Sequence, residues 1–273
     1  MQGKGIDLVE INSDVKNYYE EKYSEDKREK REVMEFVRSK RIISRYLSDT
    51  CMEIADVCGA TGAYAFWLAE MGHRVHLLDL AENHIEIAKQ KSRECGISLA
   101  SYSCADARKL PYDDESMDMV LLMGALYHLR EPASRMQCLK EARRILKRGG
   151  RLICTVMNRY NYLIASLKYS HLIESMGLEP IKQAFETGWI DSATFTGLPL
   201  HYGHTPEEIR SEMTDAGFSN IELTAVEGLA NALGKAVDDV KDFDLLMECL
   251  DLVDRIPGMV GVTRNIIAAG VRV

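Results

Sequence analysis

Three carboxylates in the first half of the chain each close a short apolar run. They are Asp56, Asp79 and Asp106, and the first two stand 23 residues apart. If each run is a strand of one parallel sheet, the three carboxylates meet at one edge, because ligands bind outside the carboxyl ends of such strands. A carboxylate at the position of Asp79 can accept hydrogen bonds from both hydroxyls of a ribose. The spacing therefore predicts one binding site built from three strand ends.

A turn of small residues follows Asp56 directly, namely Cys58, Gly59, Ala60, Thr61 and Gly62. Small side chains let the backbone of such a turn approach a ligand, because larger ones would occupy its volume. The free N–H groups at the start of the next helix suit a carboxylate or a phosphate. Gly59 and Gly62 alone would fit an ordinary strand-to-helix turn equally well. The combination of this turn with Asp79 and Asp106 is the more specific signal.

Short apolar runs alternate with amphipathic helical patterns from residue 51 onward. Strands are predicted at Cys51–Val57, Arg74–Asp79, Leu99–Cys104, Met117–Met123 and Arg151–Met157. Helices are predicted at Ala63–Met71, Glu82–Cys95 and Ala133–Lys147, the last closed by Gly149 and Gly150. Strands separated by helices of this length predict βαβ units and a parallel sheet with helices on both faces.

The flanking regions follow a different pattern. Residues 14–49 are predicted to be helical throughout, and helical pieces are predicted near 160–176 and 237–255. A helix begins after Thr205, where a threonine cap, Pro206 and Glu208 form a typical start signal. Strands are predicted at Phe218–Glu227 and Asn265–Val271. The predicted division is a helical cap over 1–49, a binding core over 50–157, a substrate lid over 158–204 and the rest of the sheet over 205–273.

The stretch from about residue 50 to 157 resembles the class I methyltransferases, in particular the type 11 group that acts on small molecules. The resemblance lies in ADVCGATGAYAFWLAEMG, VHLLDL, CADARKLPYDDESMDMVLLMGALYHL and EARRILKRGGRLI. The later segment HTPEEIRSEMTDAGFSNIELTAVEG is similar to a recurrent piece of the same group. The resemblance implies a Rossmann-like α/β fold with a seven-stranded, mostly parallel sheet and a terminal antiparallel hairpin strand.

The resemblance also implies the cofactor S-adenosylmethionine, with S-adenosylhomocysteine as the product. The first loop would contact the methionine part, Asp79 the ribose, and Asp106 the adenine amino group. The cofactor-binding residues expected on this basis are Asp56, Cys58, Gly59, Ala60, Gly62, Asp79, Leu80, Asp106, Ala107, Met123 and Gly124. Where the family loop has D-x-G-x-G-x-G, Cys58 and Ala60 stand at the first two glycine positions.

Candidates for the chemistry lie beyond the ends of the strands. Transfer of a methyl group from a sulfonium needs a base only if the acceptor must lose a proton. His128 follows the fourth strand, where the resemblance places acceptor-facing residues, and its unperturbed pKa suits a base. A structural histidine at a helix start is the alternative. Tyr202 and His204 are further candidates that would line an acceptor pocket, and the alternative for them is an ordinary loop.

Composition narrows the function classes. The formal net charge of −8 argues against a nucleic-acid partner, and no apolar stretch of roughly 18 residues predicts a membrane span. The seven cysteines form no C-x-x-C pair, so neither a metal site nor a disulfide framework is predicted. A cytoplasmic location fits these features best. The partner expected is a small-molecule methyl acceptor, and a homodimer is left open.

Two other functions remain open at this point. Because Cys58 and Ala60 replace glycines of the family loop, the chain could be a catalytically silent protein that binds S-adenosylmethionine as a sensor or partner subunit. A nicotinamide-dependent oxidoreductase could also use Asp79 to hold a ribose. The expected hairpin strand and the Asp106 segment speak against the oxidoreductase. The leading hypothesis is methyl transfer to a small organic acceptor by direct in-line displacement.

Overall fold

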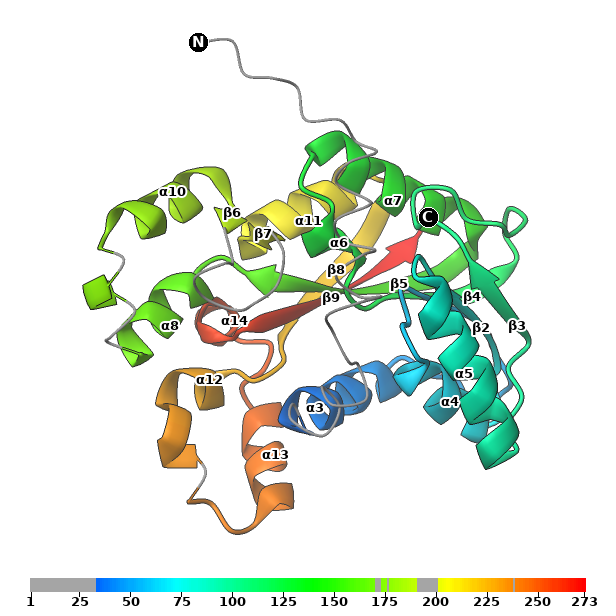
Figure 1. Cartoon of the computed structure of the whole chain (residues 1–273), viewed down its shortest axis with the longest axis horizontal. Coiled ribbons are helices and arrows are strands. Elements are labelled where there is room, and N and C mark those ends of the chain that lie inside the picture. The colour runs from blue at the N-terminus through cyan, green and yellow to red at the C-terminus, as the bar shows by residue number, and fades with distance from the viewer. Residues whose placement is uncertain (1–32, 170–172, 176, 191–200, 238) are drawn as a thin grey trace.

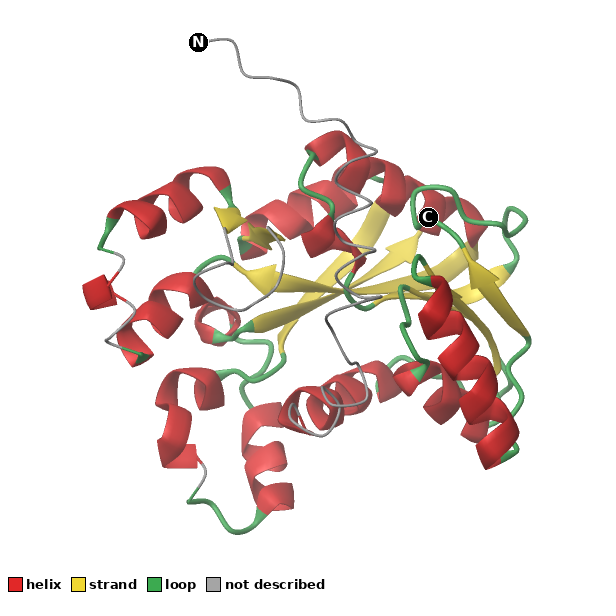
Figure 2. Cartoon of the chain, in the orientation of Figure 1, coloured by secondary structure: helices red, strands yellow, loops and turns green. Residues whose placement is uncertain are grey.

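A twisted sheet runs through the centre of the structure, with helices on both of its faces (Figures 1 and 2). The structure is a computed structural model that describes residues 33–273 apart from 170–172, 176, 191–200 and 238. Nine strands lie in these residues: β1 Glu53–Val57, β2 Arg74–Asp79, β3 Ser101–Cys104, β4 Met117–Leu122, β5 Leu146–Asn158, β6 Trp189–Ile190, β7 His201–His204, β8 Phe218–Ala225 and β9 Asn265–Arg272.

The strand order places the ends of β1, β2 and β4 side by side. β3, β2, β1, β4 and β5 pair in that order, each pair parallel. β9 then runs antiparallel between β5 and β8. The central strands β1 and β4 are almost fully buried, as expected for a parallel sheet covered on both faces, whereas β3 at the edge is partly exposed. The carboxyl ends of β1, β2 and β3 therefore share one edge of the sheet.

The helices divide between the two faces of the sheet. The described helices are α3 Val33–Ser44, α4 Ala63–Glu70, α5 Glu82–Cys95, α6 Ala125–His128, α7 Pro132–Ile145, α8 Asn161–Lys168, α10 Glu179–Thr187, α11 Pro206–Asp215, α12 Leu229–Leu233, the 3₁₀ helix η3 Gly234–Val237, α13 Phe243–Asp251 and α14 Pro257–Val262. One apolar core joins α7 and α11 to the sheet, and a second joins α3, α4 and α5. Within the described residues, no helix is both long and apolar enough to cross a membrane.

Two short strands extend the sheet beyond the end of β4. β7 pairs in parallel with the end of β5, through Met157 and Gly203, and β6 pairs antiparallel with β7. Met157 pairs at the same time with Asn265 of β9. Since a strand has only two edges, β7 must occupy the edge of β5 that β4 occupies further back along β5. β7 therefore continues the line of β4, past its carboxyl end.

The predicted fold class is confirmed. Strands β1–β5, β8 and β9 are the seven expected strands, and β9 is the antiparallel hairpin strand. The predicted bounds of β2 and α5 are those observed, and Gly96 ends α5 in a left-handed conformation. Thr205 and Glu208 form the predicted capping box at the start of α11. The sequence does not predict β6 and β7, which lie in the segment expected to form the substrate lid.

The predicted end of the helix before Gly149 is wrong. α7 ends at Ile145, and β5 begins at Leu146, so that Gly149 and Gly150 lie inside a strand. Leu146 is fully buried and pairs with Met117 of β4. Burial and sheet pairing thus override the local helical pattern and its Gly-Gly stop signal.

The helical predictions for the flanking regions are only partly correct. Of the predicted helix over 14–49, residues 14–32 lie outside the described residues, and α3 ends at Ser44 rather than at residue 49. The predicted helix near 160–176 is α8, which ends at Lys168. The predicted helix over 237–255 is the shorter α13, which follows α12 and η3.

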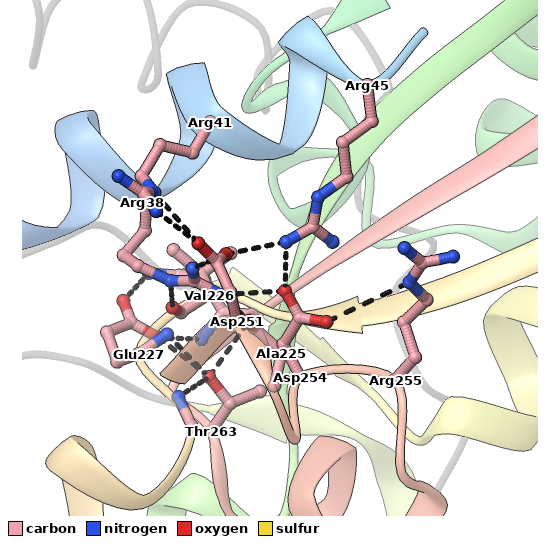
Figure 3. A network of polar contacts seen from close by, with 12 residues as sticks. Arg38, Arg41, Arg45, Ala225, Val226, Glu227, Asp251, Asp254, Arg255 and Thr263 are labelled. Atoms are coloured by element: carbon pink, nitrogen blue, oxygen red, sulfur yellow. Dashed lines mark hydrogen bonds and ion pairs between the residues drawn. The ribbon is translucent and has the colours of Figure 1, made fainter. Parts of the chain in front are cut away.

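A buried cluster of charges attaches α3 to the C-terminal part of the chain (Figure 3). The Arg38 guanidinium is fully buried and forms ion pairs with Asp251 and Asp254, which lie in and after α13. It also donates to the carbonyl oxygen of Val226 at 2.9 Å. Arg41 forms a second ion pair with Asp251, but its side chain is 38 % exposed. Arg45, just after α3, pairs with both Asp251 and Asp254 at 2.6 Å, so three arginines hold these distant segments together.

We expect Arg38→Ala to lower the free energy of unfolding by about 1.5–3 kcal/mol, because it removes buried hydrogen bonds to two carboxylates and to the Val226 carbonyl oxygen, while Arg45 stays paired with both carboxylates. Arg41→Ala is the matched control: it removes an exposed contact to the same Asp251 and should cost about 0–1 kcal/mol. Urea denaturation of the two variants and the wild type measures both values. Equal losses for the two variants would contradict the prediction.

Candidate functional site

The loop after β1 is held against the end of β2. The Gly59 N–H donates to the carbonyl oxygen of Leu78 at 3.1 Å, and the Ala60 N–H donates to the Asp79 carboxylate at 2.9 Å. The loop then turns into α4 at Gly62, whose N–H donates to the Gly59 carbonyl oxygen at 2.9 Å. These bonds join the small-residue turn and Asp79, as the sequence predicts for one site.

The two residues that stand at family glycine positions adopt the conformation that favours glycine. Cys58 has φ 59° and Ala60 has φ 48°, both in the left-handed region. That region costs a residue with a Cβ atom roughly 1–2 kcal/mol. The loop therefore keeps the backbone path of a glycine-rich turn at the expense of local strain.

The two glycines present in the loop are required for different reasons. A Cβ atom at Gly59 would lie 2.5 Å from Leu77 Cδ1 and 2.6 Å from an Asp56 carboxylate oxygen, so packing excludes a side chain there. Gly62 has φ 89°, and a Cβ atom would lie 2.9 Å from the Phe66 ring. Substitution at either position would displace the loop.

Asp56 is a fully buried carboxylate beneath this loop. Neither of its oxygens has a hydrogen-bond partner of normal geometry among the described residues. Burial first, and then the charge of Asp79, raise its pKa to about 7, against an opposing effect of the Ala65 backbone N–H in α4. A buried acceptor without a donor is costly, and a positively charged group bound nearby would relieve that cost.

Asp79 organises the end of β2. One of its oxygens accepts the Ala60 N–H, and the other accepts the Ala81 N–H at 2.9 Å and lies 3.2 Å from His84 Nδ1. A carboxylate offers about four lone-pair positions, so acceptor capacity remains for hydroxyl donors. Leu80, the next residue, accepts a weak hydrogen bond from the Cys104 thiol at 3.4 Å.

Asp106 follows β3 by two residues and is engaged with a neighbouring cation. It accepts the Arg108 backbone N–H at 2.8 Å and pairs with the Arg108 guanidinium at 2.6 Å. The hydrogen bond between the two side chains raises the pKa of Arg108, although the partial burial of the guanidinium acts in the opposite direction. Ala107 is buried behind the carboxylate. The third predicted carboxylate thus lies at the same sheet edge, in a local ion pair that the sequence analysis had not considered.

The segment after β4 turns sharply into α6. Gly124 has φ 142°, and a Cβ atom there would lie 3.0 Å from the Tyr127 hydroxyl oxygen. The sulfur of Met123, just before it, accepts a hydrogen bond from the Thr155 hydroxyl at 3.3 Å. The half-buried His128 ring lies against the Tyr127 ring, with centroids 4.4 Å apart. His128 therefore stands at the end of α6, beyond the carboxyl end of β4, as predicted.

The other two catalytic candidates lie in β7 and are buried. The His204 side chain is fully buried, and its Nε2 lies 3.2 Å from a Glu212 carboxylate oxygen. Burial lowers the pKa of His204 in spite of Glu212, so the ring is neutral near pH 7. The Tyr202 hydroxyl accepts a hydrogen bond from Arg159 at 3.0 Å. Both side chains are thus committed to contacts inside the protein.

Several residues around β7 escaped the sequence analysis. Two buried arginines lie near the Tyr202 ring, with Arg135 Cζ 3.8 Å and Arg159 Cζ 5.5 Å from its centroid. Gly188, at the end of α10, has φ 75°, and a Cβ atom would clash with both Arg159 and Tyr202. No local pattern marks these arginines, because their partners come from distant parts of the chain.

The sequence also suggests that Met157, Met176, Trp189, Phe195 and Met213 form an apolar acceptor pocket and that Tyr18 and Tyr19 close over the cofactor, with ordinary packing as the alternative. Met213 is fully buried in the apolar core beside Cys154, 4.0 Å from sulfur to sulfur. Trp189 in β6 is half-buried, and the Arg130 guanidinium lies over its ring at 5.7 Å. Tyr18, Tyr19, Met176 and Phe195 lie outside the described residues. Among the residues that are described, no cluster of three or more His, Cys, Asp or Glu side chains could hold a metal ion.

Comparison with known proteins agrees with this geometry. Residues 55–154 match the profile of a methyltransferase domain. A demethylmenaquinone methyltransferase of Listeria welshimeri is 27 % identical over 188 residues, which span 66 % of this chain and 75 % of the relative. One of Alkalihalophilus pseudofirmus is 27 % identical over 180 residues, which span 63 % of this chain and 72 % of the relative.

Solved structures share the fold. A SAM-dependent methyltransferase of Methanosarcina mazei superposes with a TM-score of 0.58 at 18 % identity, covering 85 % of this chain and 97 % of that one. The magnesium protoporphyrin IX methyltransferase of Synechocystis, solved with bound SAM, superposes with a TM-score of 0.56 at 14 % identity over 100 % of both chains.

We expect Ala60→Gly to raise the free energy of unfolding by roughly 0.5–1 kcal/mol. It removes the left-handed strain, and the greater freedom of glycine in the unfolded chain offsets only part of that gain. Ala69→Gly in α4 is the control and should cost about 0.5–1 kcal/mol, because its backbone is helical. Chemical denaturation without ligand measures both. A loss of stability in both variants would refute the strain at Ala60.

Asp56 should make the ligand-free protein less stable as the pH rises. Its folded pKa of about 7 lies above its ordinary value, so the folded state holds the proton longer than the unfolded chain. Relative to Asp56→Asn, the wild type should lose about 1.4 kcal/mol per pH unit between roughly pH 4 and pH 7. Denaturation across this range measures the difference, which should be constant outside it. A constant difference across the whole range would contradict the prediction.

Proposed function

We propose that this chain, a class I methyltransferase that depends on S-adenosylmethionine, methylates a small organic acceptor by direct in-line displacement. The observation that carries the proposal is the unsatisfied Asp56 carboxylate beneath a loop that is hydrogen-bonded to Asp79. A buried carboxyl group whose negative charge is disfavoured by burial and by Asp79 suits a ligand that carries positive charge. The neighbouring Asp79 suits a ribose on the same ligand.

In this proposal, the cofactor is held along the edge formed by β1, β2, β3 and β4. The turn residues Cys58, Gly59, Ala60 and Gly62 border the cofactor above Asp56 with small side chains, and Asp79 with Leu80 holds the ribose. Asp106 and Ala107 border the adenine, and Met123 and Gly124 close the site from β4. When bound, S-adenosylmethionine supplies a methyl group on a sulfonium, whose leaving group departs uncharged.

The chain's own contribution is to position the acceptor and to keep water away. α6 and β7 lie beyond the carboxyl end of β4, and α8 and α10 lie between β5 and β6 in the chain. We assign the segment 158–204 as the cover of the acceptor. The segment has a small apolar core of its own, which includes Tyr162, Ile181 and Ile190.

Among the three catalytic candidates, we favour His128 as the base for an acceptor that must lose a proton. It is half-buried rather than sealed in the core, and it follows the strand end at which the cofactor is proposed to lie. His204 is fully buried and in contact with Glu212, and the Tyr202 hydroxyl accepts from Arg159. We propose that these two side chains shape the acceptor side of the site and take no part in proton transfer.

The acceptor class is tested first with demethylmenaquinone, because the similar proteins of Listeria and Alkalihalophilus are demethylmenaquinone methyltransferases. A mixture of small-molecule extracts is tested beside it with S-adenosylmethionine that carries a labelled methyl group. Labelled organic product is the expected result. Tight cofactor binding in calorimetry without labelled product from any extract would instead support the silent cofactor-binding protein.

His128→Phe should lower kcat about 10²–10⁴-fold if the acceptor must be deprotonated, while cofactor affinity stays unchanged. Phenylalanine keeps a ring against Tyr127, so packing is largely retained. His76→Gln is the control, since the His76 ring lies between Ser101 and Glu53 in the sheet. Initial rates and calorimetry on both variants are the measurements. If His128→Phe keeps the wild-type kcat, His128 is not the base.

A further inference from the structure

Arg135, in the first turn of α7, is attached to the end of α6. Its guanidinium Nη1 donates to the carbonyl oxygens of Leu129 at 3.1 Å and Arg130 at 2.6 Å. These carbonyls directly follow α6, and a helix end leaves its last carbonyl groups without partners inside the helix. Arg135 is 2 % exposed, so the contact is shielded from water.

The other edge of the same guanidinium faces the cover. Nε donates to Glu212 of α11 at 2.9 Å, and Nη2 forms an ion pair with the same carboxylate at 2.8 Å. The Tyr202 ring lies under the guanidinium, 3.8 Å from Cζ to the ring centroid, and meets the His204 ring edge-on at 4.7 Å. Glu212 also contacts His204. Arg135, Tyr202, His204 and Glu212 thus form one closed group, which we call the Arg135 cluster.

Stability alone gives a poor account of this cluster. Replacing a buried ion pair with well-packed apolar side chains is often neutral or stabilising, because burial of charge is costly. What an apolar side chain could not do is donate to two carbonyls on one side and to a carboxylate on the other in fixed directions. The planar fork of Arg135 fixes the distance between the end of α6 and β7.

A second arginine of α7 shows the contrast. Arg143 lies two turns further along and donates to the carbonyl oxygens of Gly217 and Val273, both at 3.1 Å. It therefore also attaches backbone segments, but at the C-terminal hairpin and far from α6 in the chain. The two arginines therefore differ in the segments that they attach to α7: Arg135 attaches the end of α6, and Arg143 attaches the C-terminal hairpin.

We propose that Arg135 is a positioning residue that fixes α6, and with it His128, against the β7 cover so that the acceptor meets a preformed surface. The assignment of α6 to the acceptor rests on the function proposed above. The attachment of α6 by Arg135 does not. Arg135 itself contacts neither cofactor nor acceptor.

The test compares Arg135→Met, Arg135→Lys and the control Arg143→Met in the full-length protein. Hydrogen exchange in the peptide 124–131 should accelerate at least tenfold in Arg135→Met and remain within twofold of wild type in Arg143→Met. Arg135→Lys should fall between wild type and Arg135→Met, because one ammonium cannot replace the fork. Exchange in α4 and α5, and calorimetric affinity for S-adenosylmethionine, should be unchanged.

With an acceptor in hand, Arg135→Met should raise its KM or lower kcat at least tenfold without changing cofactor affinity. If Arg135→Met fails to fold, Arg135→Lys decides by the same readouts. Unchanged exchange in 124–131, or an equal rise throughout the protein, overturns the proposal. If no acceptor is methylated at all, the proposed function fails, while the exchange measurement still judges Arg135.

Discussion

Parallel pairing of β1 with β2 and with β4 is the constraint on which the site depends. Val57 pairs with both Leu78 and Leu122, so the chain leaves all three strands at nearly the same level. Whatever follows these strands must then share one small region of space. The turn after β1, the carboxylate of Asp79 and the segment into α6 meet because of backbone hydrogen bonds made elsewhere. The residues that could bind a ligand therefore meet at this edge because of the register in which the strands pair.

The parts of this structure that were predictable from sequence are those fixed by local signals. Both bounds of β2 and α5 follow from an apolar run, a helical period and the glycine at 96. The predicted end of α7 was wrong because the burial of Leu146 in the sheet outweighs the helix-stop signal of Gly149 and Gly150. β7 could not be read from HYGH, since among the described residues its ladder partners are Met157 and Asn158, much earlier in the chain, and the short strand β6.

The candidate site shows the same division. The sequence placed the carboxylates at the strand ends, because their spacing follows the alternation of strands and helices. It could not foresee that Cys58 and Ala60 take up left-handed conformations, or that Asp106 pairs with Arg108. Arg38 and Arg135 resembled the exposed cations of amphipathic helices. Each is buried because its partners, Asp251 and Glu212 among them, come from much later in the chain.

The anchoring of the cover at both ends has a consequence for how such a protein can diversify. At one end the chain leaves β5 at Asn158, and at the other it returns through β6 into β7, which is bonded to the same β5. The helices α8 and α10 between these fixed points belong to an insertion at a single place in the sheet. Its length and composition can drift, by insertion or exchange of whole helices, without altering the level at which β1, β2 and β4 end. The sheet and the insertion are therefore free to evolve at different rates.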